Sequence, residues 1–141
     1  MNKILVEVSV GELLDKISIL EIKKDKIKNP EKLEYILDEL SILKDELKNN
    51  IKSDVKLDEL YQSLKIINAR LWVIEDDKRK CEKEKDFTEN FIKLSRDVHI
   101  LNDDRAKIKL KINEQTGSKI KLEINNLTGS KIKEIKEYTS Y

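Results

Sequence analysis

The chain has few of the residues that interrupt helices. Its 141 residues include three glycines and one proline, and aromatic side chains make up only 5%. Sheet proteins need turn residues every few positions, so this composition favours long helices over strands. Cys81 is the one cysteine and cannot form a disulfide within the chain. Nothing therefore indicates an oxidising compartment, and we expect a cytoplasmic protein.

An excess of charge of one sign is also absent. The chain has 29 Lys and Arg against 28 Asp and Glu, a net charge of +1, although charged residues make up 40%. Disordered chains combine low hydrophobicity with high net charge, so the balance favours a folded protein. The local exception is 105–136, which has an excess of basic residues. This segment matches no nucleic-acid-binding motif and lacks the interleaved aromatics of single-strand binders, so we interpret it as a solvated basic end and expect no nucleic-acid partner.

Long apolar runs are missing as well. The longest candidate, Ile4 to Val10, is interrupted by Glu7 and is too short for a membrane span or for the apolar part of a signal peptide. We therefore expect no membrane partner. Within this segment Ile4, Val6 and Val8 alternate with other residues, which predicts a short strand. Its partner could be the final KIKEIKEY segment.

What the chain has is apolar residues at heptad spacing, above all from 57 to 112. The first seam consists of Leu57, Leu60, Leu64, Ile67, Leu71, Ile74 and Cys81, with Lys78 in a polar position. The second consists of Phe87, Phe91, Leu94, Val98, Leu101, Ile108 and Ile112, with Arg105 in a polar position. Two seams of equal length on either side of a charged break predict an antiparallel helical hairpin.

Two further helices are predicted in the first fifty residues. Ser9 and Glu12 have the spacing of a capping box, and the stripe that follows is Val10, Leu13, Ile17, Leu20 and Ile27. Asn29 and Pro30 suit an N-cap and a first helical position, and the next stripe is Leu33, Ile36, Leu40, Leu43 and Leu47. The two could form a hairpin or one kinked helix. We favour the kinked helix, because Asn29 alone is a very short connection for a reversal.

The remaining helix ends are also marked. Ser53 or Asp54 should cap the third helix, and Asp86 with Glu89 forms a second capping box, before the fourth helix. The tail holds a repeat, since INEQTGSKIK at 112–121 recurs as INNLTGSKIK at 124–133. Gly117 and Gly129 suit the left-handed position after a helix.

These patterns predict one all-α domain over 1–141. Its architecture is an antiparallel four-helix bundle, or a long helical hairpin that dimerises into one, with coiled-coil-like helices and possible short terminal strands. Residues 113–141 form a duplicated Gly-Ser tail.

Catalytic motifs are missing. The sequence contains no HExxH, GxSxG, CxxC or Gly-rich phosphate loop, and one His with one Cys cannot supply a standard zinc site. We therefore predict no catalytic residues, no metal and no cofactor.

A polar stripe beside the seams is the candidate for a ligand cleft or, in the interpretation we favour, a lateral interface. It comprises Asn68, Trp72, Glu75 and Arg79 on one predicted helix and Arg96, Asn102, Asp103 and Arg105 on the other. If the hairpin pairs about Lys85, Trp72 comes opposite Arg96.

Four segments carry a resemblance to a known family. They are VEVSVGELLDKISILEIKK, LWVIEDDKRKCEKEKDF, FIKLSRDVHILNDDRAKIK and the GSKI element before a tyrosine-bearing end. Together they resemble a small uncharacterised bacterial family, a domain of unknown function, in which the second Gly-Ser copy is a departure. That resemblance implies no activity. The chain is more weakly similar to small all-helical chorismate mutases, which bind a dianionic substrate through Arg and Lys, but its opening helix has no arginine.

Two functional hypotheses follow. The first is a noncatalytic helical interaction or scaffolding module that forms a homo-oligomer, with a dimer favoured, or binds a protein partner. The alternative is a small helical enzyme or binding protein for an anionic metabolite, with a bundle pocket like that of the chorismate mutases.

Overall fold

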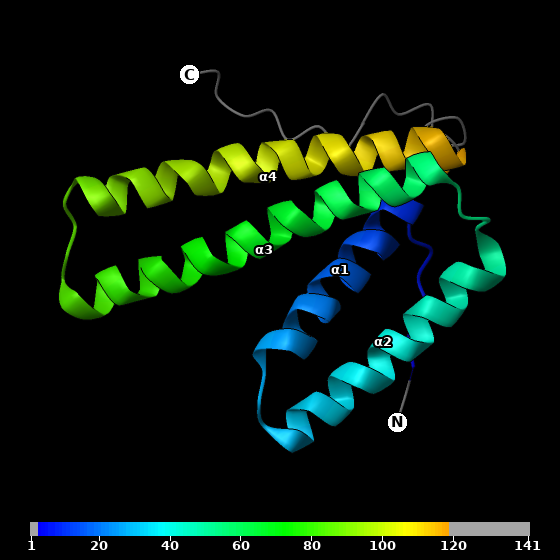
Figure 1. Ribbon diagram of the computed structural model, residues 1–141, viewed down its shortest axis with the longest axis horizontal. Helices are drawn as coiled ribbons and strands as arrows, with labels where there is room; N and C mark the ends of the chain where they lie inside the picture. Colours follow the sequence, from blue (N-terminus) through cyan, green and yellow to red (C-terminus); the bar gives the residue numbers. More distant parts are fainter. Residues whose placement is uncertain (1–2, 119–141) are drawn as a thin grey trace.

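The computed structural model describes residues 3–118. Four helices span most of them: α1 (Val10–Lys26), α2 (Pro30–Asn50), α3 (Val55–Glu84) and α4 (Glu89–Thr116). Figure 1 shows that they form two antiparallel hairpins, α1–α2 and the longer α3–α4, packed as a helical bundle. The predicted all-α class is confirmed.

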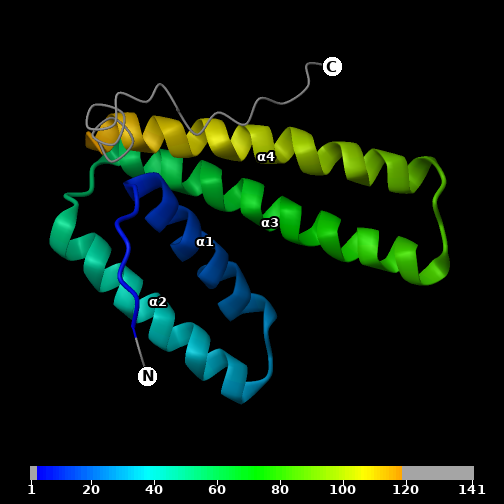
Figure 2. The same ribbon diagram turned by 180° about the vertical axis from the view of Figure 1, so that it is seen from behind.

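The two hairpins lie at an angle to each other. The α1–α2 hairpin packs against one half of the α3–α4 hairpin, and the other half projects beyond it in both views (Figures 1 and 2). We call the projecting part, residues 73–100, the distal arm. Helix α1 lies between α2 on one side and α3 and α4 on the other, whereas α2 has backbone neighbours only in α1 among the described helices. Helix α1 therefore joins the two hairpins.

Three of the predicted helix starts are confirmed by their caps. Ser9 Oγ accepts a hydrogen bond from the Glu12 amide at 3.2 Å. Asn29 Oδ1 accepts from the Lys32 amide at 3.1 Å. Asp54, rather than Ser53, caps α3, because its Oδ1 accepts from the Leu57 amide at 2.8 Å. Each of these side chains satisfies an amide that has no partner within its helix.

The predicted capping box of the fourth helix is wrong. The N-cap of α4 is Thr88, whose side chain makes no capping bond. Asp86 instead accepts hydrogen bonds from the backbone amide and hydroxyl of Thr88. The reason lies one residue earlier, where Lys85 adopts a left-handed conformation with φ 57° and ends α3. Asp86 therefore lies two residues before the N-cap, and its side chain bonds within the connection instead of capping α4.

The prediction that the first two helices form one kinked helix is also wrong. Helix α1 ends at Lys26, and both Ile27 (φ −86°, ψ 127°) and Asn29 (φ −67°, ψ 122°) are extended. The connection is thus three residues long rather than one. Three residues suffice for two antiparallel helices to reverse.

The predicted amino-terminal strand is not present either. Residues 3–9 carry no regular secondary structure, and Val10 is the first residue of α1. Ile4 and Leu5 are 87% and 93% exposed, so no sheet covers them. The KIKEIKEY segment suggested as a strand partner, and Gly129 of the second repeat, lie outside the described residues. Gly117 does take the predicted left-handed position at the end of α4, with φ 66°.

Most of the core comes from the predicted heptad seams, to which Leu14 is added from outside the predicted stripe, and one seam residue is an exception. The main cluster contains Leu14, Ile17, Leu20, Ile36, Leu40, Leu57, Leu64 and Ile112. A second, smaller cluster of Leu71, Ile74 and Leu101 lies at the base of the distal arm. The exception is Phe87, which precedes α4, is 50% exposed and packs edge-to-face on Phe91 with ring centroids 5.5 Å apart.

Candidate functional site

A polar cluster lies inside the bundle on the face of α1 that meets α3 and α4. Gly11, Asp15 and Ser18 follow one another at four- and three-residue steps, which places them on one face of the helix. All three are buried, and Asp15 and Ser18 are only 1% and 0% exposed. Since α1 is covered on two sides, this face is buried together with its apolar stripe.

Asp15 is the centre of this cluster. Its carboxylate accepts a hydrogen bond from Arg105 Nε at 2.9 Å and a second, close one from Arg105 Nη2. Asn68 Nδ2 donates to it at 2.9 Å, and Lys109 Nζ lies 3.7 Å away. Burial raises the pKa of Asp15, but the hydrogen bonds from Arg105 and Asn68 outweigh it and hold the pKa below its ordinary value. Asp15 is therefore an ionised group that links α1 to α3 and α4.

Further hydrogen bonds connect the other members of the cluster. Asn68 Nδ2 donates to Ser18 Oγ at 2.7 Å, and Ser18 Oγ donates to the Asp15 carbonyl oxygen at 2.8 Å. On the outer side, Arg105 Nη1 lies 3.4 Å from Asn102 Oδ1. A carboxylate whose pKa is held below its ordinary value is a weak base near neutral pH. The arrangement links α1 to α3 and α4 through hydrogen bonds.

The amino terminus of α1 is held by the end of α4. The Gly11 amide donates to Asn113 Oδ1 at 2.7 Å, and the Val10 amide donates to Ser118 Oγ at 3.3 Å. Lys109 Nζ pairs with Glu12 at 2.6 Å. A Cβ on residue 11 would lie 2.5 Å from the Lys109 carbonyl oxygen, so the close approach of the two helices requires glycine there. The first copy of the Gly-Ser element thus serves as a cap for α1.

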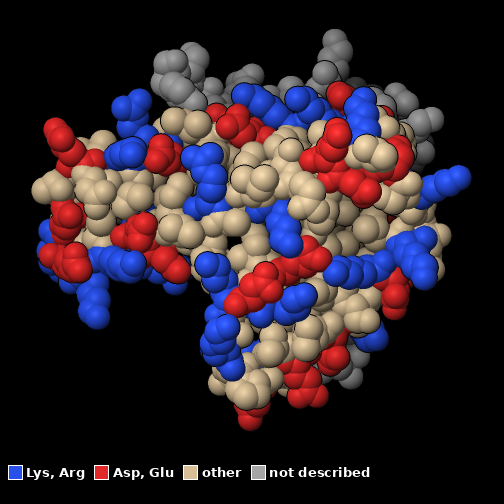
Figure 3. Space-filling view, viewed as in Figure 1, with Lys and Arg blue, Asp and Glu red and all other residues tan. Residues whose placement is uncertain are grey.

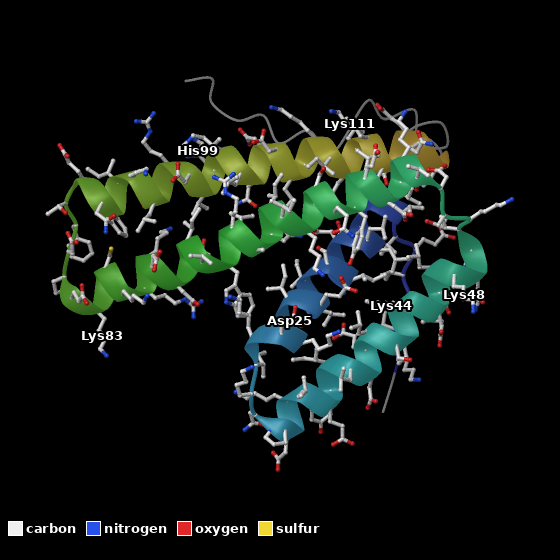
Figure 4. The ribbon with its side chains drawn as sticks, in the orientation of Figure 1. Asp25, Lys44, Lys48, Lys83, His99 and Lys111 are labelled. Carbon is white, nitrogen blue, oxygen red and sulfur yellow. The ribbon has the colours of Figure 1, made fainter. Side chains whose placement is uncertain are left out.

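A second polar cluster ties α1 to α2 and α3. Glu21 lies 2.8 Å from Lys44 Nζ and 3.0 Å from Lys65 Nζ, and it accepts a hydrogen bond from the Tyr61 hydroxyl at 2.5 Å. Figure 4 shows Lys44 on α2. Burial acts to raise the pKa of Glu21, yet its three donors lower it from 4.5 to about 2. Burial and the Glu21 carboxylate raise the pKa of Tyr61.

The structure places some of the candidate residues predicted from the sequence near Asp15 and others on the surface. It brings Asn68, Asn102 and Arg105 into or beside the Asp15 cluster. Asp103 is half-buried on the same part of α4, and Trp72 is half-buried on α3. Glu75, Arg79 and Arg96 are exposed. The suggested pairing of Trp72 with Arg96 stays a prediction.

Sequence reasoning missed the acidic members of both clusters, which are Glu12, Asp15 and Glu21, and their partners Ser18, Lys44, Tyr61, Lys65 and Lys109. One signal was available. Asp15 and Ser18 share a helical face with Gly11 and Ile22, so they interrupt a second stripe on α1. A polar pair in such a place indicates a buried partner on another helix.

Two shallow grooves mark the surface. One, which we call the arm groove, has a volume of about 350 Å³ on the distal arm and is lined by Glu89, Ile92, Lys93, Arg96, Asp97 and Ile100 of α4. The other, of about 630 Å³, is lined by Lys56, Glu59, Leu60, Ser63, Lys111, Glu114 and Gln115. Figure 3 shows acidic and basic side chains interspersed over the visible face, without a broad area of one sign. Within residues 3–118, no group of three or more His, Cys, Asp or Glu is placed to hold a metal ion.

The fold and its buried ionic clusters define a small α-helical bundle protein with two hairpins joined through α1. The chain belongs to a family of unknown function, DUF6165, whose model matches residues 4–140. This confirms the family membership that the sequence segments indicated. A search of curated proteins and a search of solved structures found no match. None of the described helices is long and apolar enough to cross a membrane.

Proposed function

We propose that this protein is a noncatalytic helical interaction module of the cytoplasm that self-associates through its distal arm. The observation that carries the proposal is the exposure of large apolar side chains on both helices of the arm. Val73 on α3 is 48% exposed, and Ile92 and Ile100 on α4 are 54% and 40% exposed. The α1–α2 hairpin does not extend over this part of the molecule (Figure 1). Ile92 and Ile100 lie together in the arm groove, and exposed apolar side chains that lie together mark interaction surfaces.

The charges of the arm groove favour a second copy as the partner. Glu89 and Asp97 supply negative charge beside Ile92 and Ile100, while Lys93 and Arg96 supply positive charge. A strongly acidic or strongly basic partner would place like charges against half of these groups. A surface with both signs can complement a copy of itself, as an isologous interface requires. Trp72, which precedes Val73 on α3, belongs to the lateral surface that the sequence predicts.

The pairing of the interior Arg and Lys side chains with carboxylates supports a noncatalytic role over metabolite binding. Arg105 and Lys109 are paired with Asp15 and Glu12, and Lys65 is paired with Glu21. An anionic metabolite at either cluster would have to displace a bonded carboxylate. Each groove that remains open is lined by two carboxylates and two cations, so neither has a net positive charge to attract an anion.

The test is the double variant Ile92→Ser with Ile100→Ser, measured by sedimentation equilibrium up to high micromolar concentration. We expect the wild-type protein to self-associate and the double variant to have a lower average mass, because the apolar contacts of the arm groove are lost. Leu110→Ser is the matched control, since Leu110 is a 55% exposed residue of α4 outside the distal arm. It should leave the mass unchanged. An equal effect of both variants, or a strictly monomeric wild type, contradicts the proposal.

The rival function is tested through Trp72, the only tryptophan. We expect its fluorescence to be insensitive to phosphorylated sugars, nucleotides and carboxylates. A saturable change with one of these anions would favour the metabolite-binding alternative over an interaction surface.

A further inference from the structure

The segment before α1 is an exposed apolar arm. We call residues 3–8 the amino-terminal arm, and Figure 2 shows it crossing in front of α2 as an uncoiled trace. Exposure is 87% at Ile4, 93% at Leu5 and 74% at Val6, and it falls to 40% at Val8 near the bundle. Single exposed apolar residues need no explanation, but three in succession do. The part of the arm farthest from α1 therefore presents an uncovered apolar sequence to solvent.

The backbone of this arm is also available for pairing. Toward the other described residues, 3–8 make no backbone hydrogen bonds, and the nearest such bond along the chain runs from the Leu13 amide to the Ser9 carbonyl oxygen. The residues Ile4, Val6 and Val8 have side chains that favour strands. An uncoiled segment with free amides and carbonyls is a template to which another strand can add. Among residues 3–118, no strand pairs with this arm.

We propose that the amino-terminal arms of two copies of this chain pair as an antiparallel ribbon in which Leu5 lies opposite Leu5 of the second copy. This contact is separate from the distal arm and does not depend on it. Two-fold pairing about Leu5 places Lys3 opposite Glu7 and Ile4 opposite Val6, each twice. Ile4 and Val6 of both copies then form one apolar face, and the Leu5 pair is flanked by two Lys3–Glu7 ion pairs on the other face.

The charges select this register. If the arms pair about Val6, Glu7 faces Leu5 of the other copy, and Lys3 loses its opposite charge. If they pair about Ile4, Lys3 faces Leu5, and Glu7 has no partner among the arm residues. A shift by one position places Glu7 opposite Ile4 or Lys3 opposite Val6. Of these registers, only the one about Leu5 combines opposite charges with apolar pairs.

A ribbon of two short strands is marginal by itself, so the pairing should be detected by a method that captures it. The first test is disulfide cross-linking with oxidised dithiothreitol in chains carrying Ile92→Ser and Ile100→Ser, which removes the proposed contact of the distal arm. Leu5→Cys should form a covalent dimer, because residues directly opposite in an antiparallel pair have Cα atoms about 4.5–5.5 Å apart, within disulfide range. The parent chain is the control, since its Cys81 is buried.

Two further cysteine variants test the register. Ile4→Cys alone and Val6→Cys alone should cross-link at least fivefold more slowly than Leu5→Cys. In the proposed register, position 4 of one copy lies opposite position 6 of the other, so neither cysteine faces its own counterpart. A mixture of the two should yield the mixed disulfide. Equal rates at all three positions, or no dimer from Leu5→Cys, would overturn the proposal. The latter result is expected if the arm pairs with a segment of its own chain.

Charge exchange gives an independent measure. Lys3→Glu and Glu7→Lys should each slow the Leu5→Cys cross-linking severalfold, because each places like charges opposite one another in two positions. The double variant Lys3→Glu, Glu7→Lys restores opposite charges and should recover the rate. Since these positions are exposed, circular dichroism should show unchanged helix content in all variants. Failure of the double variant to recover would contradict the register.

Discussion

Asp15 occupies a position where packing between helices would ordinarily favour an apolar side chain. It is 1% exposed, between Leu14 and Ile17 of the main core. A buried ion pair often adds no stability over apolar residues of the same volume, because both charges must be removed from water. The pair with Arg105 instead fixes the packing geometry of two helices. Because the guanidinium bonds both carboxylate oxygens, it sets where α1 crosses α4. We infer that this cluster selects one arrangement of the hairpins among several with similar apolar contacts.

Replacing Asp15 alone should be costly. In Asp15→Asn, the side chain keeps its size but leaves Arg105 without its buried counter-ion, which should lower the free energy of unfolding by roughly 3 kcal/mol. The matched control is Asp104→Asn, whose side chain is 49% exposed and pairs with Lys107 at 3.6 Å. That exposed pair should contribute less than about 1 kcal/mol. Urea unfolding followed by circular dichroism measures both.

The apolar double variant tests whether charge or packing is responsible. Asp15→Leu combined with Arg105→Met removes both charges, so it should be less destabilising than Arg105→Met alone, which leaves Asp15 ionised and buried. Equal costs for Asp15→Asn and Asp104→Asn would show that the cluster contributes no more than a surface pair.

At the scale of the element, the heptad spacing predicted the four helices and most of the residues that they bury. Seam positions are recognisable because a helix with one covered face repeats apolar residues every three or four positions. Helix α1 departs from that rule, since it is covered by α2 on one side and by α3 and α4 on the other. Its second face includes Gly11, Asp15 and Ser18, none of which is apolar and large. Apolar periodicity could not reveal this face, and the available signal was the polar pair Asp15 and Ser18, whose partners come from distant parts of the chain.

The cap on α1 gives a test with an internal control. Asn113→Ala removes the acceptor of the Gly11 amide and should cost about 1–2 kcal/mol, as the loss of a helix cap does. Asn125 occupies the equivalent place in the second copy of the repeat. If the first copy is the cap, Asn125→Ala should change the free energy of unfolding by less than about 0.5 kcal/mol. Thermal unfolding of both variants compares the copies, and equal costs would indicate that they share the role.

Connections were the least predictable elements. The reversal between α1 and α2 depends on where α1 ends, and Ile27 fits the apolar stripe well enough to suggest that the helix continues through it. Asp86 has the right spacing for a cap but is used by the turn, since Lys85 ends α3 in a left-handed conformation. Local sequence leaves both alternatives open, and the packing of the hairpins decides between them.

At the scale of the whole molecule, the two halves of the α3–α4 hairpin have unequal support. The proximal half shares the main core with α1 and α2, whereas the distal arm adjoins a cluster of only Leu71, Ile74 and Leu101. Segments with fewer buried contacts open at lower free energy than the rest of a protein. Because the α1–α2 hairpin does not cover the distal arm, its surface is open to the second copy that we propose as its partner.

Native-state hydrogen exchange should detect this difference within a single helix. In a chain carrying Ile92→Ser and Ile100→Ser, amides from Ile74 to Cys81 should exchange at least about tenfold faster than those from Leu57 to Leu64, a difference of about 1.4 kcal/mol in opening free energy. The comparison is matched, because both segments are eight residues of α3 with a similar heptad pattern. In the wild-type protein, raising the concentration should slow exchange in the first segment and leave the second unchanged, because the proposed contact covers the distal part of α3 and not its proximal part. Equal protection of both segments at every concentration would mean that the hairpin is uniformly stable and that its distal arm is not the surface that associates.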